Sequence, residues 1–113
     1  RRARHFGALE IVLATNHRTL RRGRLDSGER FEDASARYSE IVRRIAREHH
    51  VALCDVRTAF ERFDDEQLAE LVLPAPDLLH LSEEGNRVYA EIIAPSLHES
   101  MGRLLAEHSA VGA

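Results

Sequence analysis

The sequence contains no lysine, only one cysteine and no long apolar run. A single cysteine rules out an intramolecular disulfide framework, and Cys54 lies in an apolar stretch where such a side chain packs as a small hydrophobic group. The apolar runs all fall short of the roughly 20 residues that a membrane-spanning helix needs. We therefore expect a domain without disulfide bonds and without a membrane span.

All 16 basic residues are arginine, and 19 acidic residues outnumber them, which gives a formal net charge of -3. A nucleic-acid-binding protein would be expected to show a basic face, so this balance argues against a nucleic-acid partner. The densest positive cluster, Arg18, Arg21, Arg22 and Arg24, is interpreted as part of a solvated loop. With 113 residues, of which 43% are hydrophobic, the chain is long enough for one small globular domain.

The first half of the chain has the order strand, helix, strand. Residues 9–15 and 51–56 are short apolar runs, which predict buried parallel strands. Between them, Phe31 to His50 predicts an amphipathic helix whose buried face contains Tyr38, Ile41, Val42, Ile45 and Ala46. Loops at the carboxyl ends of parallel strands are where ligands bind in open α/β sheets. Asn16 and His17, which follow the first strand, are therefore candidates for a substrate pocket.

The second half of the chain predicts further helices. Residues 60–63 and 65–73 indicate a short helix, which Pro74 and Pro76 stop while stiffening the following loop. A long helix starts near Ser82, a good N-cap, and Pro95 is expected to kink or interrupt it. Its predicted buried face contains Val88, Ile92, Ile93, Leu97, Met101, Leu104 and Leu105. Residues 108–113 are expected to form a frayed tail.

The loop before the long helix contains Asp77-Leu78-Leu79-His80, which places a carboxylate and an imidazole three residues apart. At this spacing, one turn can bring Asp77 back onto His80. A carboxylate beside a histidine fixes the tautomer of the ring and stabilises the imidazolium that forms when the ring takes a proton from a nucleophile. On its own, the pattern is also typical of a turn in which the aspartate and the histidine only cap or pack.

The stretch from Asp77 to Ala90 closely resembles the last conserved block of the GDSL/SGNH esterase family, and residues 8–15, 38–49 and 51–56 extend the resemblance more loosely. The resemblance implies an α/β fold, a three-layer αβα sandwich with a parallel sheet of the flavodoxin-like kind. It also implies a serine ester hydrolase in which His80 is the general base of a Ser-His-Asp triad and Asp77 orients it. The implied partner is a small-molecule ester, and neither a metal ion nor a cofactor is required.

Other parts of that family's site are not recognisable in this sequence. The family's nucleophile lies in a Gly-Asp-Ser motif, and its oxyanion-hole Gly and Asn lie in later blocks that also precede the matched region. Asp26-Ser27-Gly28 lacks the preceding Gly and the apolar strand, so we interpret it as a surface loop. No Gly-x-Asn pattern surrounds Asn16, so the oxyanion role is not assigned to it. We expect residues 1–107 to be the carboxyl-terminal portion of a single SGNH-hydrolase-like domain, inactive by itself.

Two other interpretations stay open. A catalytically inactive, esterase-like binding or interaction module would carry the same residues. A receiver domain would use Asp55 as its phosphoacceptor, but receivers also use a lysine, and an Asp after a strand more often caps the next turn. His49 and His50 diverge by about 100° on a helix. We therefore assign these two residues to the helix end, and no metal site is predicted.

Overall fold

Two short parallel strands lie at the centre of the structure, a computed structural model that describes the backbone of residues 10–112 and the side chains of residues 10–106. Strand β1 is Val12–Ala14 and strand β2 is Ala52–Cys54, paired with their first residues opposite each other. The prediction of two parallel strands is confirmed, although both are shorter than expected. Val56 starts a helix instead of ending a strand, and Leu9 lies outside the described residues.

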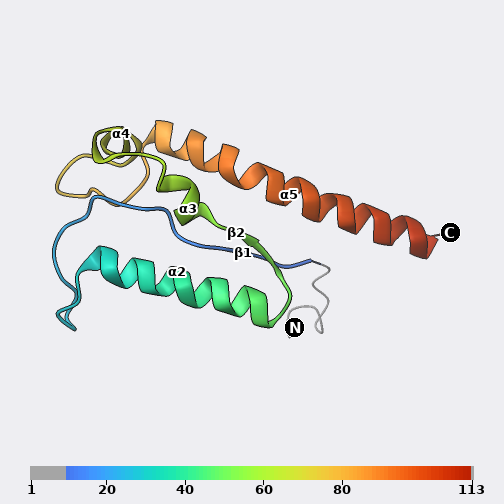
Figure 1. Cartoon of the computed structure of the whole chain (residues 1–113). Coiled ribbons are helices and arrows are strands. Elements are labelled where there is room, and N and C mark those ends of the chain that lie inside the picture. Colours follow the sequence, from blue (N-terminus) through green and yellow to red (C-terminus); the bar gives the residue numbers. More distant parts are fainter. Residues whose placement is uncertain (1–9, 113) are drawn as a thin grey trace.

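Two long helices lie on opposite sides of the strand pair (Figure 1). Helix α2, Phe31–Glu48, packs against both strands, and helix α5, Glu83–Gly112, packs against β2. The result is a mixed α/β structure with a two-stranded parallel sheet. The carboxyl ends of both strands point toward the end of the molecule at which α2 and α5 begin (Figure 1). The loops that follow the strands therefore meet the amino-terminal ends of both helices.

The apolar face of α2 is only partly covered. Its buried residues are small, namely Ala34, Ser39 and Ala46. Tyr38 and Ile45, which we expected to be buried, are 57% and 38% exposed. Two strands are too narrow to cover the width of this helix face, so only the small residues nearest the strands are enclosed. The spacing of apolar residues predicted the α2 helix correctly. This spacing does not indicate which other element covers the apolar face of the helix.

Two short helices follow β2 and pack against the first turns of α5. Helix α3 is Val56–Phe60 and helix α4 is Asp65–Leu71, where Asp64 forms a capping box with Gln67. The predicted helix at 65–73 is confirmed over most of its length, whereas residues 61–63 are not helical. The buried core lies between these helices, β2 and α5, and consists of Cys54, Val56, Phe60, Leu68, Leu71, Val72 and Val88.

Helix α5 begins at its predicted position, where the Ser82 hydroxyl caps the N–H of Gly85 at 3.1 Å. It continues through Pro95, so the break that we allowed for there is wrong, whereas the kink stays a prediction. Its second half runs past the strands (Figure 1), and Leu97, Met101 and Leu105, which we expected to be buried, are exposed. The backbone is helical as far as Gly112, which includes most of the segment expected to fray. Within residues 10–112, no helix combines the length and the apolar character that a membrane crossing requires.

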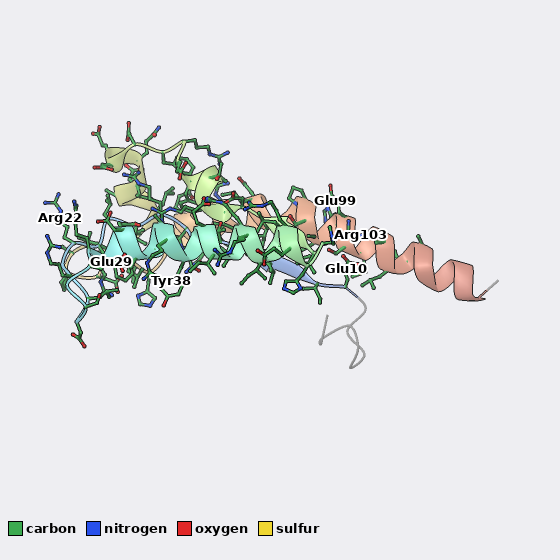
Figure 2. All side chains as sticks on the ribbon, turned by 60° about the horizontal axis from the view of Figure 1, so that its bottom comes forward. Glu10, Arg22, Glu29, Tyr38, Glu99 and Arg103 are labelled. Carbon is green, nitrogen blue, oxygen red and sulfur yellow. The ribbon has the colours of Figure 1, made fainter. Side chains whose placement is uncertain are left out.

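One ion pair ties the projecting part of α5 to the segment before β1. Arg103 Nη2 lies 2.9 Å from Glu10 Oε1, and Arg103 also donates to the Ser100 hydroxyl at 3.2 Å (Figure 2). Glu10 is well covered, with 11% of its side chain exposed, while Arg103 is 45% exposed. This contact links the second half of α5 to the segment before β1.

Candidate active site

The loop between α4 and α5 is closed on itself by backbone hydrogen bonds. Leu73 N donates to His80 O at 2.8 Å, and Leu78 N donates to Leu73 O at 3.1 Å. Leu78 has a φ of 55°, a left-handed conformation that is uncommon for residues other than glycine and that turns the chain sharply. This turn brings the side chains of Asp77 and His80 together.

Asp77 and His80 form a hydrogen-bonded pair, as their spacing led us to expect. His80 Nδ1 lies 2.9 Å from Asp77 Oδ2, and Asp77 Oδ1 accepts from the backbone N–H groups of His80 and Leu79 at 2.7 and 2.9 Å. These hydrogen bonds, the one from the His80 ring first, lower the pKa of Asp77 from 3.8 to about 2. Asp77 is therefore an anion at neutral pH, and it holds a proton of the His80 ring on Nδ1.

The opposite edge of the His80 ring, which carries Nε2, has no hydrogen-bond partner among the described residues. The His80 side chain is 72% exposed, whereas that of Asp77 is 29% exposed. His80 also lines a hollow of about 460 Å³. The pair therefore presents a nitrogen that can accept a proton beside a space large enough for a small organic group.

Asn16 and His17, the two residues predicted to border a pocket, both line this hollow. The rest of its lining is mixed, with apolar groups from α2, the 77–81 loop and α5 and polar groups between them: Thr19, Phe31, Ser35, Leu79, Leu81, Asn86 and Tyr89. The site is thus assembled from the loop after β1, the first turns of α2 and α5, and the Asp77–His80 loop. Asn86 comes from the first turn of α5, and no pattern in the sequence indicated that it would line the same hollow as His80.

His17 holds the Asp77–His80 loop in place. Its Nε2 lies 2.8 Å from Leu79 O, and because a carbonyl can only accept, this nitrogen carries the hydrogen. The ring packs against Phe60 with centroids 5.5 Å apart. A second bond from the same segment, Leu20 N to Leu78 O at 3.1 Å, adds to the attachment. His17 is therefore a positioning residue, since its Nε2 is already engaged.

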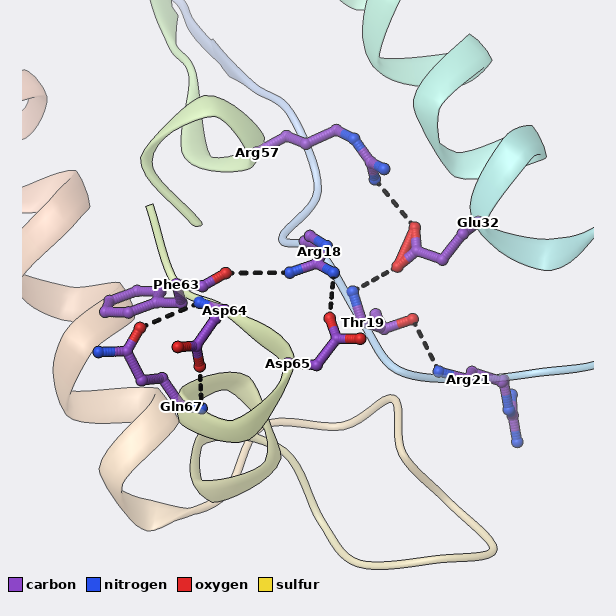
Figure 3. A network of polar contacts seen from close by, with 9 residues as sticks. All are labelled: Arg18, Thr19, Arg21, Glu32, Arg57, Phe63, Asp64, Asp65 and Gln67. Atoms are coloured by element: carbon purple, nitrogen blue, oxygen red, sulfur yellow. Dashed lines mark hydrogen bonds and ion pairs between the residues drawn. The ribbon is translucent and has the colours of Figure 1, made fainter. Parts of the chain in front are cut away.

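A partly buried ion pair supports the wall of the hollow (Figure 3). Arg57 Nη1 lies 3.1 Å from Glu32 Oε2 and donates to the Ser35 hydroxyl at 3.1 Å, with 10% of the Arg57 side chain exposed. The other Glu32 oxygen accepts from Thr19 N. We did not identify Arg57 or Glu32 from the sequence, because charged residues 25 positions apart carry no pairing signal. Ser35 lines the hollow with His80, but among the described residues no hydrogen bond joins the two.

Asp55 has a structural role at the end of β2. Arg43 binds its carboxylate through Nε at 2.8 Å and Nη2 at 3.1 Å, and Thr15 and the backbone of Thr58 also donate to it. The Arg43 guanidinium holds the pKa of Asp55 well below its usual range. Asp55 is the N-cap of α3, the role that we favoured. A carboxylate with both oxygens engaged is poorly placed to accept a phosphoryl group.

The adjacent residues His49 and His50 lie at the end of a helix, as we expected from the sequence. His49 is the C-cap of α2, with its N–H directed to Ile45 O at 3.0 Å, and His50 has a φ of 52° at the turn into β2. In the part of the chain that the structure describes, no three His, Cys, Asp or Glu side chains are grouped in a way that could hold a metal ion.

The lowered pKa of Asp77 predicts how the free energy of unfolding depends on pH. Its value near 2 in the folded chain, against 3.8 ordinarily, means that the Asp77 hydrogen bonds stabilise the fold fully above about pH 5 and are lost as the pH falls toward 2. The difference in unfolding free energy between wild type and Asp77→Asn should therefore shrink over that range, as measured by urea unfolding from pH 2 to 6. The exposed Asp26→Asn substitution is the control, and a constant Asp77→Asn difference would contradict the pairing.

The geometry thus provides a carboxylate, a histidine oriented by it, a nitrogen able to accept a proton and a hollow lined partly by apolar groups. Such an arrangement suits general acid–base catalysis on a small organic substrate. Comparison of the chain with models of protein families, with curated proteins and with solved structures gave no significant match, so the function of the site is inferred from its residues and geometry.

Proposed function

We propose that this chain supplies the histidine and aspartate of a serine ester hydrolase of the GDSL/SGNH type. The observation that carries the proposal is the 2.9 Å contact between His80 Nδ1 and Asp77 Oδ2, while Nε2 of this hollow-lining residue has no hydrogen-bond partner among the described residues. A catalytic triad needs this orientation of the imidazole ring, because Nδ1 must face the carboxylate and Nε2 must face the nucleophile. The resemblance of residues 77–90 to the last block of that family supports the same roles.

In the proposed reaction, a serine attacks the ester carbonyl and His80 Nε2 takes its proton. Asp77 stabilises the imidazolium that results. His80 then gives the proton to the departing alcohol, leaving an acyl-enzyme that water hydrolyses with His80 again as base. We place the serine and the oxyanion-hole donors upstream of residue 1 in the complete protein, because no Gly-Asp-Ser motif occurs in this sequence. No cofactor takes part.

The same proposal extends to the fold. An α/β structure with helices on both sides of a parallel strand pair is compatible with part of a three-layer αβα sandwich. Parallel sheets usually have more than two strands and are covered on both faces. We propose that further strands, supplied by the rest of the domain, complete this sheet and cover the apolar side chains that α2 and α5 leave exposed.

The test is ester hydrolysis by the complete protein with and without a fluorophosphonate, a reagent that phosphonylates activated serines. We expect turnover of a short-chain aryl ester, complete loss of turnover after treatment, and one labelled serine upstream of residue 1. A protein that neither turns over esters nor takes the label would instead be an inactive, esterase-like binding module. Label on Ser35, which shares the hollow with His80, would contradict the upstream position of the nucleophile.

A further inference from the structure

A second hollow, of about 520 Å³, adjoins the first and is strongly cationic. The two hollows share Thr19 and Phe31 in their linings, so they are neighbours. The second is lined by the segment after β1, the first turn of α2, and single residues of α3 and α4. Its charged lining consists of five arginines and two acids: Arg18, Arg21, Arg22, Arg30, Arg57, Glu32 and Asp65. This concentration of positive charge contrasts with a formal net charge of -3 for the whole chain.

Both acids of this hollow are already paired (Figure 3). Asp65 forms an ion pair with Arg18, whose guanidinium also donates to Phe63 O at 3.1 Å. Glu32 forms an ion pair with Arg57 at 3.1 Å. These contacts fix two of the five guanidinium groups in the wall and neutralise them. Neither acid is left over to balance the other arginines.

Arg21, Arg22 and Arg30 form no ion pair with any carboxylate in the portion of the chain described by the structure. The Arg21 guanidinium lies over the Phe31 ring, 5.8 Å from its centroid, and this contact leaves its N–H edge free for a ligand. Arg22 projects at the end of the molecule opposite to the end of α5 (Figure 2). Three like charges lining one concave surface raise the local potential and attract anions.

The start of α2 adds to this field. Its N-cap is Arg30, whose side chain forms no capping hydrogen bond. The positive end of the helix dipole therefore lies in the wall of the cationic hollow. The acid in this turn that lines the hollow, Glu32, is engaged by Arg57 and by the N–H of Thr19. The hollow thus combines a helix terminus with three arginines that have no carboxylate partner among residues 10–106.

We infer that the cationic hollow binds a phosphate group carried by the ester substrate. This inference rests on the proposed function for its substrate class, which is an ester with a phosphate at one end and the scissile carbonyl at the other. Arginine forks match the paired oxygens of phosphate, and three of them suit a dianion better than a single carboxylate. With the phosphate held by Arg21, Arg22 and Arg30, the remainder of the molecule extends past Thr19 and Phe31 toward His80.

Binding of inorganic phosphate and of pyrophosphate to the complete protein, measured by calorimetry, tests the anion site without any catalytic step. We expect saturable binding that Arg21→Gln, Arg22→Gln and Arg30→Gln each weaken about tenfold. Arg47→Gln removes the same charge from the exposed last turn of α2 and should leave the affinity unchanged. No binding, or equal weakening by Arg47→Gln and the three hollow variants, would overturn the inference.

Measuring both phosphate binding and ester turnover in these variants distinguishes a failure of the anion site from a failure of the proposed function. If phosphate binds as expected but no ester is hydrolysed, the esterase proposal fails and the anion site stands. If ester turnover is present but phosphorylated and neutral esters react equally well in wild type and in Arg21→Gln, the substrate class is wrong. Sedimentation with phosphatidylcholine vesicles that contain phosphatidic acid distinguishes a lipid headgroup from a soluble phosphate. Cosedimentation that the three variants abolish would identify the headgroup as the source.

Discussion

Replacing His80 by alanine is expected to lower ester turnover by the complete protein at least about 10³-fold. In the proposed reaction, no other group takes the proton of the attacking serine once the ring is removed, and Asp77 keeps only its backbone hydrogen bonds. The loss should appear mainly in kcat, because a general base acts in the transition state more than in substrate binding. Stopped assays with a short-chain aryl ester over a range of concentrations measure both parameters.

His98→Ala is the matched control for this experiment. His98 lies on the exposed surface of α5, away from the lining of the hollow, and the same substitution there should change turnover less than twofold. Because the His80 side chain is itself 72% exposed, His80→Ala should leave the circular dichroism spectrum unchanged. Turnover by His80→Ala within twofold of wild type would contradict its role as the base.

A substitution in the first turn of α5, Gly85→Ala, is expected to lower the stability of the fold strongly. A Cβ atom on Gly85 would lie 1.9 Å from Leu71 O, a distance that no side chain can accept. That carbonyl also accepts the N–H of Ser82 at 2.9 Å, and the Ser82 hydroxyl donates to Glu70 O at 2.7 Å. Gly85→Ala must therefore push α5 away from α4, and we expect it to lower the free energy of unfolding by about 3 kcal/mol. Urea unfolding followed by circular dichroism measures this change.

Gly102 offers a control within the same helix. A Cβ there meets no atom within 4 Å, so Gly102→Ala should raise the free energy of unfolding by up to about 1 kcal/mol through helix propensity alone. Equal effects of the two substitutions would mean that α5 does not pack closely on Leu71. The close approach at Gly85 matters for the site, since it fixes α5 directly after the Asp77–His80 loop.

The sequence revealed the parts of the site that depend on local geometry. Asp77 and His80 are three residues apart, so one turn suffices to bring them together. The residues of this loop favour a turn, and the contact between the two side chains could therefore be predicted. The contact of His17 with Leu79 spans 62 positions. It depends on how β1 pairs with β2 and how α5 lies over them, and no local pattern contains that information. The location of Asn16 and His17 beside the hollow was predicted only through the general rule for strand ends.

Helix positions were predicted more reliably than helix burial. The period of apolar residues placed α2 correctly, and the N-cap pattern at Ser82 placed the start of α5. It also led us to expect buried side chains at Tyr38 and Leu97, which are 57% and 55% exposed. A two-stranded sheet offers too little surface to cover them. What lies opposite an apolar face is a property of the assembled fold.

In the proposed mechanism the Asp77–His80 pair activates a serine, and the rate at which a fluorophosphonate labels that serine reports on the activation. The measurement compares the complete wild-type protein with His80→Ala, Asp77→Asn and His98→Ala, and mass spectrometry identifies the labelled residue. We predict one labelled serine whose labelling rate falls by at least about 10²-fold in His80→Ala, falls in Asp77→Asn and is unchanged in His98→Ala. A labelling rate in His80→Ala equal to that of the wild type would contradict the activation of a serine by this pair.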